Sequence, residues 1–276
     1  MAQLGEDTAI MDAEEIQIGY AWLKIKSRTL ADLESTRIRI ENRQHAYLLK
    51  KLGDDCPQRG TKAFTELILD GTHGLLLEAE KSATKRLEAL VQEVVGPSMM
   101  AFLDLPGIGP KLLARLLGEV GHPVLAFPMH WEEHPDAKGD EPKRTLHADE
   151  PYERTVSQLW AYCGLGDPAK VRKAGTSQED NMAAGNRKAG SFAYQLATSS
   201  KRLTGKPDKN GVIRRRSPYR SVYEEKKAFY VDGRPEWTAG HSENAALRYT
   251  AKRVLRDIWV ASMADLRGQG GELLAA

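Results

Sequence analysis

The stretch L-P-G-I-G-P-K-L-L-A, at residues 105–114, constrains the fold of this chain more than any other. Pro106 ends one helix because proline cannot donate to the helical hydrogen-bond ladder, and Gly107 and Gly109 permit a tight turn with positive φ. A second helix restarts at Pro110, since proline suits the first position of a helix. The stretch therefore predicts a helix-hairpin-helix, two short helices joined by a glycine turn.

Such a turn brings main-chain amides close to a bound phosphate, because the first amides of a helix have no partner within the helix. Gly107, Gly109 and Lys111 are therefore candidate contacts to a nucleic-acid backbone, held without reading of base sequence. The alternative is an ordinary helical hairpin in which the glycine turn only packs.

The charge balance is nearly even, with 40 Lys and Arg against 38 Asp and Glu and a formal net charge of +2. A surface for nucleic acid must therefore come from local clusters of basic residues. Such clusters occur after residue 169, and their candidate phosphate contacts are Lys170, Arg172, Lys173, Arg187, Lys188, Arg214, Arg215 and Arg216. The last three lie in a longer basic segment, residues 201–220, which Gly205, Pro207 and Gly211 break into a loop or arm. The alternative for this arm is a solvated surface run.

The cellular compartment is predicted from cysteines and apolar runs. Two cysteines, Cys56 and Cys163, fit a reducing cytoplasm and form no CxxC zinc pair. Acidic residues at the start of the chain argue against a secretory signal, and no stretch of about 18 apolar residues could span a membrane. We therefore expect a cytoplasmic protein with no membrane partner and no metal site of its own.

The first hundred residues predict two long helices, at residues 12–52 and 61–95, separated by a break at residues 53–60. The second carries one apolar stripe at three- and four-residue spacing. In the first helix Ser27, Arg37 and Gln44 interrupt the apolar seam. The pattern favours an antiparallel helical hairpin or coiled coil that forms a homodimer or a higher oligomer, with a monomeric bundle as the alternative.

Residues 123–151 are rich in proline and mixed charge, which predicts a loop. Within it, His130-Trp131-Glu132-Glu133-His134 has the H-x-x-E-H letters of an inverted zincin. That motif needs a helix to place two imidazoles on one face, and flanking prolines leave little room for one. A solvated loop is the favoured interpretation.

Five motifs then follow one order along the chain. They are the L-P-G-I-G hairpin, A-Y-x-G-L within residues 161–165, the basic glycine loop K-V-R-K-A-G at 170–175, a K-x-G turn at 188–190, and a closing helix of the form A-x-x-x-x-A-K-R-x-L-R-x-I-W at 246–259. This order resembles the C-terminal half of the insertion-sequence transposases that work with a bridge RNA, a group that includes the pilin-gene invertases. The resemblance covers about two thirds of the chain, and residues 37–45 resemble the coiled coil of that family.

The resemblance implies a DNA recombinase architecture, from which this sequence departs twice. Family members begin with a RuvC-like domain whose carboxylates hold Mg²⁺, and no matching pattern of strands precedes the helical hairpin here. The family also places a nucleophilic serine just before a glycine of the basic loop, where this chain has Ala174 before Gly175. Alanine cannot attack a phosphodiester, so activity is uncertain.

Two nearby hydroxyls, Ser177 and Ser191, are candidate catalytic residues. The alternative for both is a structural role, since serine beside glycine often caps a helix and Ser191 stands where a helix is expected to begin.

The sequence thus predicts a mostly α protein: a long helical hairpin or coiled coil at 1–96, a helix-hairpin-helix at 97–124, a loop or insertion at 125–154, and a C-terminal transposase-like helical domain at 155–276. We expect it to bind DNA or structured RNA without cutting alone and without a cofactor. The alternative is one component of an active transposase, with a serine nucleophile and with Mg²⁺ held by a RuvC-like partner protein. A structural helical protein is a third hypothesis.

Overall fold

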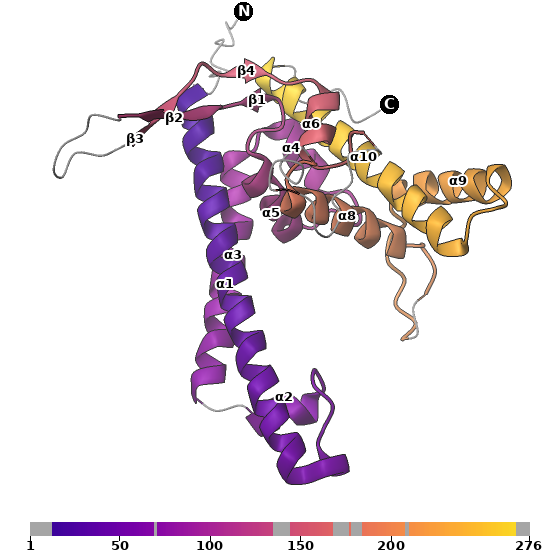
Figure 1. Cartoon of the computed structure of the whole chain (residues 1–276). Helices are drawn as coiled ribbons and strands as arrows, with labels where there is room; N and C mark the ends of the chain where they lie inside the picture. The colour runs from indigo at the N-terminus through magenta and orange to yellow at the C-terminus, as the bar shows by residue number, and fades with distance from the viewer. Residues whose placement is uncertain are drawn as a thin grey trace, which may run out of the picture.

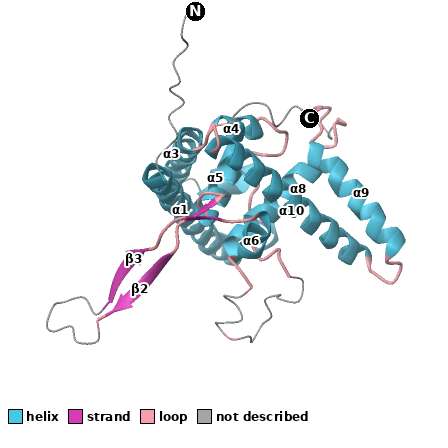
Figure 2. Cartoon of the chain, turned by 90° about the horizontal axis from the view of Figure 1, so that it is seen from above, coloured by secondary structure: helices cyan, strands magenta, loops and turns pink. Residues whose placement is uncertain are grey.

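A computed structural model describes residues 13–68, 71–134, 144–167, 177, 184–207 and 210–268. This described part is mostly helical, which confirms the predicted fold class (Figure 1). A long helical stalk projects from a compact head of shorter helices, and a two-stranded ribbon leaves the head to one side (Figures 1 and 2).

The stalk is built from α1 (Ala13–Leu52), α2 (Lys62–Ile68) and α3 (Gly71–Val94), with a single 3₁₀ turn at Gly53–Asp55. Helix α3 runs back along α1 towards the head, so the two helices are antiparallel (Figure 1). The sequence predicted one helix over residues 61–95, and the structure instead has α2 and α3 there. Gly71 begins α3 and Gly74 lies in its first turn. Glycine has a low helix propensity, so the two glycines lower the helix propensity of the predicted helix close to the point where it is divided.

The predicted hairpin region contains α4 (Pro97–Leu103) and α5 (Pro110–Val120), each with proline at its first position. The Asp265 carboxylate, from the last helix, accepts hydrogen bonds from the amides of Ser98 at 2.7 Å and Met99 at 3.1 Å. It therefore caps α4, whose own N-cap residue is Gly96. Helix α5 crosses α1 closely at Gly118, where an added Cβ would lie 3.0 Å from the Leu23 carbonyl oxygen.

The segment predicted as a loop forms two antiparallel pairs of strands. Strand β1 (Leu125–Ala126) pairs with β4 (Tyr152–Glu153), and β2 (Met129–Glu133) pairs with β3 (Arg144–Ala148) to make the projecting ribbon (Figure 2). The loop prediction was therefore wrong for these residues. Because the H-x-x-E-H letters begin on a strand, the helical face that a zincin needs is absent there, and His130 instead stacks on His147 and contacts Asp149 at 2.7 Å.

The C-terminal half supplies α6 (Val156–Tyr162), α8 (Arg187–Arg202), α9 (Pro218–Gly233) and α10 (Ala239–Leu266). One hydrophobic core joins these helices to the stalk and the hairpin, with buried members such as Leu23, Val91, Leu113, Ala193 and Val254. The core thus crosses the predicted boundaries at 96/97 and 154/155. No helix of the described residues is long and apolar enough to cross a membrane.

Candidate nucleic-acid interface

The glycine turn between α4 and α5 is packed on one side and open on the other. Gly107 has φ +98°, and an added Cβ would lie 2.6 Å from the Cα and Oγ of Ser200 on α8. Ile108 is buried, and its amide donates to the Leu105 carbonyl at 3.0 Å. Gly109 has φ −82°, and an added Cβ there would meet no atom within 4 Å. The face at Gly109 is therefore the accessible part of the turn.

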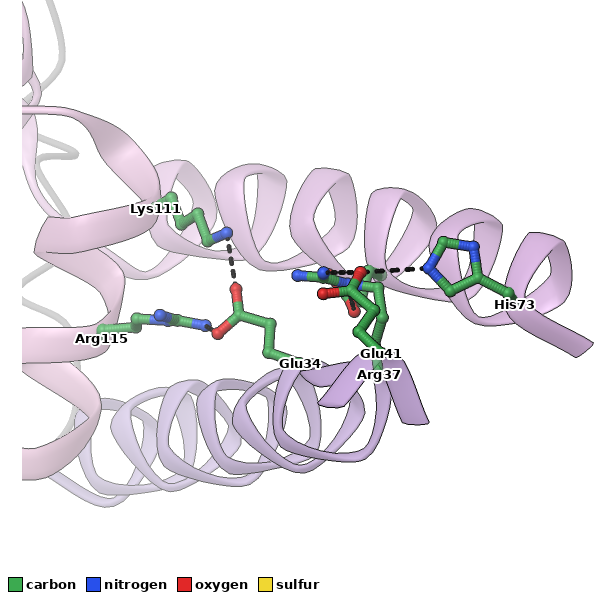
Figure 3. Close-up of polar contacts among 7 residues, drawn as sticks. Glu34, Arg37, Glu41, His73, Lys111 and Arg115 are labelled. Carbon is green, nitrogen blue, oxygen red and sulfur yellow. Dashed lines mark hydrogen bonds and ion pairs between the residues drawn. The ribbon is translucent and has the colours of Figure 1, made fainter. Parts of the chain in front are cut away.

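The cations of α5 are held by a carboxylate of the stalk (Figure 3). Glu34 accepts hydrogen bonds from Lys111 Nζ at 2.9 Å and from an Arg115 Nη at 2.6 Å. Burial acts to raise the pKa of Glu34, but these two hydrogen bonds outweigh it and hold the pKa below its usual range. Lys111 was predicted to contact phosphate, and here its ammonium is already paired with Glu34.

The network continues along the stalk towards α2. Arg37 contacts Glu80 and Glu41, each at 2.6 Å, and the Glu41 carboxylate lies 3.1 Å from Nε2 of the buried His73 (Figure 3). Arg37 was expected only to interrupt an apolar seam. Its ion pair with Glu80 instead joins α1 to α3, a role that spacing along one helix does not indicate.

The start of α8 presents two of the predicted basic residues. Arg187 and Lys188 are exposed, and Lys188 Nζ lies 3.9 Å from the buried Glu119 carboxylate. The side chain of Asn186 caps this helix by accepting from two amides of the first turn. Lys170, Arg172 and Lys173, together with Ala174, lie outside the described residues.

The two candidate serines occupy different settings. Ser191 lies inside α8, so the expectation that a helix begins there was wrong, and its Oγ accepts a hydrogen bond from Gln195 Nε2 at 3.3 Å. Ser177 is exposed, and the residues on either side of it lie outside the described part. Among the residues described, no His, Cys, Asp and Glu side chains gather in a group that could hold a metal ion.

The described residues between α8 and α9, 203–207 and 210–217, form an arm that we call the basic arm. Pro207 and Ile213 form an isolated antiparallel bridge across it, and Arg214, Arg215 and Arg216 follow, all exposed. Arg216 contacts Glu224 at 2.6 Å. Within the described residues, four exposed cations here have no carboxylate at ion-pair distance: Arg202 at the end of α8, and Lys206, Arg214 and Arg215 in the arm.

Other basic residues near the arm are neutralised by Glu243 of α10. Lys201 and Tyr223 donate hydrogen bonds to this carboxylate, and Lys227 Nζ lies 2.8 Å from it. Burial acts to raise the pKa of Glu243, but the hydrogen bonds from the three donors outweigh this effect and lower the pKa to about 2. Lys201 belongs to the basic segment at residues 201–220 that the sequence analysis singled out. Its pairing with Glu243 could not be predicted from the sequence, because the two residues are 42 positions apart.

The turn and the basic arm are neighbours. Gly107 packs against Ser200, and α8 ends two residues later at Arg202, from which the arm departs. The turn at Gly107 and the start of the basic arm therefore both lie at the C-terminal end of α8. Comparison of this chain with protein families, with curated proteins and with solved structures finds no match.

Proposed function

We propose that this protein binds DNA or structured RNA through the basic arm and the adjacent hairpin turn, and that it does so in the cytoplasm without cutting the strand alone. The observation that carries the proposal is the group of four exposed cations at the arm without carboxylate partners. Three other cations of the head, Lys111, Arg115 and Lys201, are instead paired with glutamates. Phosphates are the partners that unpaired surface Lys and Arg bind in nucleic acids.

The hairpin turn supplies the second contact of the proposal. Helix α5 begins at this turn, so its first amides and the positive end of its dipole lie at Gly109, whose surroundings are open. The contact fixes the backbone and carries no base specificity.

The test is titration of the purified protein against labelled duplex DNA, a four-way junction and a structured RNA at two salt concentrations. Gly109→Glu places a negative charge at the open face, and Gly74→Glu is the matched control because its Cβ also meets no atom within 4 Å. We expect salt-sensitive binding that Gly109→Glu weakens and Gly74→Glu leaves unchanged. If none of the three ligands binds, the proposal is overturned. If both variants lose affinity equally, the turn is not a nucleic-acid contact.

Self-association is part of the same proposal. Ile18, Trp22 and Ile25 are about half exposed at 50%, 49% and 52%, and their spacing places them on one face of α1. A second copy of the chain could cover this face. We expect light scattering to give a dimer mass for the wild type and a monomer mass for Trp22→Glu, with Thr36→Glu as a control on the same helix. A monomeric wild type at high concentration contradicts this part.

A further inference from the structure

A cavity of about 400 Å³ lies at the opposite end of α5 from the hairpin turn. Its walls come from the first half of α1, the last turn of α5, β1, β4 and α6. Cavities of this size hold small molecules when a few polar groups converge within largely apolar walls. The walls here are rich in aromatic rings, so the few polar groups between them indicate which kind of ligand the cavity could bind.

The central polar group is Arg154, whose residue is only 8% exposed. Its Nη2 donates to three main-chain carbonyl oxygens, those of Val120 at 3.3 Å, His122 at 2.8 Å and Leu125 at 3.1 Å. These contacts fix the guanidinium, yet its buried Nε has no hydrogen-bond partner. Among the residues described, no Asp or Glu forms an ion pair with Arg154, so a buried cation faces the cavity without a counter-ion.

The aromatic groups around Arg154 are held in place. The Tyr162 ring lies 5.7 Å from the guanidinium carbon, and its hydroxyl donates to the Glu119 carbonyl at 2.9 Å. His122 packs edge-on against Tyr20, and its Nδ1 accepts from two main-chain amides. Burial, with the positive charge of Arg154, lowers the pKa of His122 to about 4, so the imidazole is neutral at physiological pH.

The remaining charges favour an anion. Lys24, exposed on α1, lines the cavity. The Glu119 carboxylate also lines it, but this carboxylate lies 3.5 Å from Arg28 and 3.9 Å from Lys188. Arg154 and Lys24 therefore leave an excess of positive charge in the cavity.

We propose that this cavity binds a small organic anion, in which a carboxylate or phosphate pairs with Arg154 and Lys24 while an aromatic ring packs against the tyrosines. A buried guanidinium gains more from a partner oxyanion than a fully solvated one does, because less water competes for it. The cavity is lined by no residue of the turn or of the basic arm, so this proposal can be tested independently of nucleic-acid binding.

Calorimetric titration with defined probes tests the proposal. Adenosine monophosphate and benzoate carry a phosphate and a carboxylate beside an aromatic ring, and adenosine has the ring without the charge. We expect at least one of the two anions to bind, with adenosine at least about tenfold weaker than its monophosphate if the phosphate is preferred. Binding of only one anion identifies which oxyanion the site takes. Equal binding of adenosine and adenosine monophosphate, without benzoate binding, overturns the assignment of an anion.

Two variants locate the binding without touching Arg154, whose carbonyl contacts hold the chain between α5 and β1. Ala21→Trp fills the cavity from an exposed position on α1, and Lys24→Ala removes a cation. Their matched controls are Ala46→Trp and Lys50→Ala, which are exposed on the same helix near its far end. Loss of affinity by about tenfold or more in the first pair alone supports the site. Binding that Ala21→Trp leaves intact, or no binding of either anion, overturns it.

Discussion

Replacing two arginines of the basic arm should halve the salt dependence of nucleic-acid binding. The arm and the adjoining end of α8 have four exposed cations without carboxylate partners. Each phosphate neutralised on duplex DNA contributes about −0.9 to the slope of log K against log salt. Four contacts give a slope of about −3.6, and Arg214→Gln with Arg215→Gln leaves about −1.8. Between about 50 and 200 mM salt, the wild type should lose roughly 150-fold in affinity and the variant roughly 12-fold.

Fluorescence anisotropy of a labelled duplex across this salt range measures both slopes. The matched control is Arg39→Gln with Arg43→Gln, two exposed arginines of α1 whose replacement changes the net charge equally. A variant slope equal to that of the wild type would refute the phosphate contacts of the arm. Equal reduction by the control would show that the slope follows net charge and not the arm.

Four further substitutions test the fold around the turn and the basic arm. Gly107→Ala should destabilise the protein by more than about 2 kcal/mol in urea unfolding, because its φ of +98° and the approach of Ser200 both oppose a Cβ, whereas Gly109→Ala should cost about 1 kcal/mol or less. Similar costs for the two would contradict the packed turn. Asp265→Ala should cost about 1–3 kcal/mol in the same assay, because two amides of α4 lose their charged acceptor, and an unchanged midpoint would contradict this cap. Glu243 has a folded pKa lowered from 4.5 to about 2, so its stabilising contribution is present above pH 4.5 and is lost as pH falls towards 2. Glu243→Gln should therefore be less stable than the wild type at neutral pH, with the difference shrinking over that acidic range.

The elements that sequence predicted well carry local signals. Pro110 occupies the first position of α5, as the hairpin motif predicted. Such signals act over three or four residues, so they can be found without knowing the fold. The apolar spacing of the stalk acts over the same distance, which is why α1 extends over nearly the residues expected.

The features that sequence missed depend on contacts between distant segments. Asp265 caps a helix whose capped residue Ser98 is 167 residues away in sequence. Strands β2 and β3 pair in a segment whose prolines predicted only a loop. The candidate site shows the same limit. Lys111 was recognised from the turn that precedes it, but its ion pair with Glu34 depends on how α1 crosses α5.

Glu34 itself gives the sharpest test of whether the turn meets phosphate. Its carboxylate is an oxyanion held by Lys111 and Arg115, so it competes with any phosphate for the same donors. Glu34→Gln removes that competitor and leaves two cations uncompensated. If both then reach phosphate, affinity for duplex DNA should rise and the salt slope should steepen by up to about 1.8.

The matched control for this change is Glu66→Gln, which removes the same charge from an exposed ion pair with Lys62 on α2. The pKa of Glu34 is held below its ordinary value, so its ion pairs stabilise the wild type at neutral pH and weaken as pH falls through that lowered pKa. Glu34→Gln should therefore be less stable at neutral pH even if it binds more tightly. A stability loss with unchanged affinity and slope would mean that Lys111 and Arg115 serve only to hold α5 against the stalk, leaving the basic arm as the nucleic-acid contact.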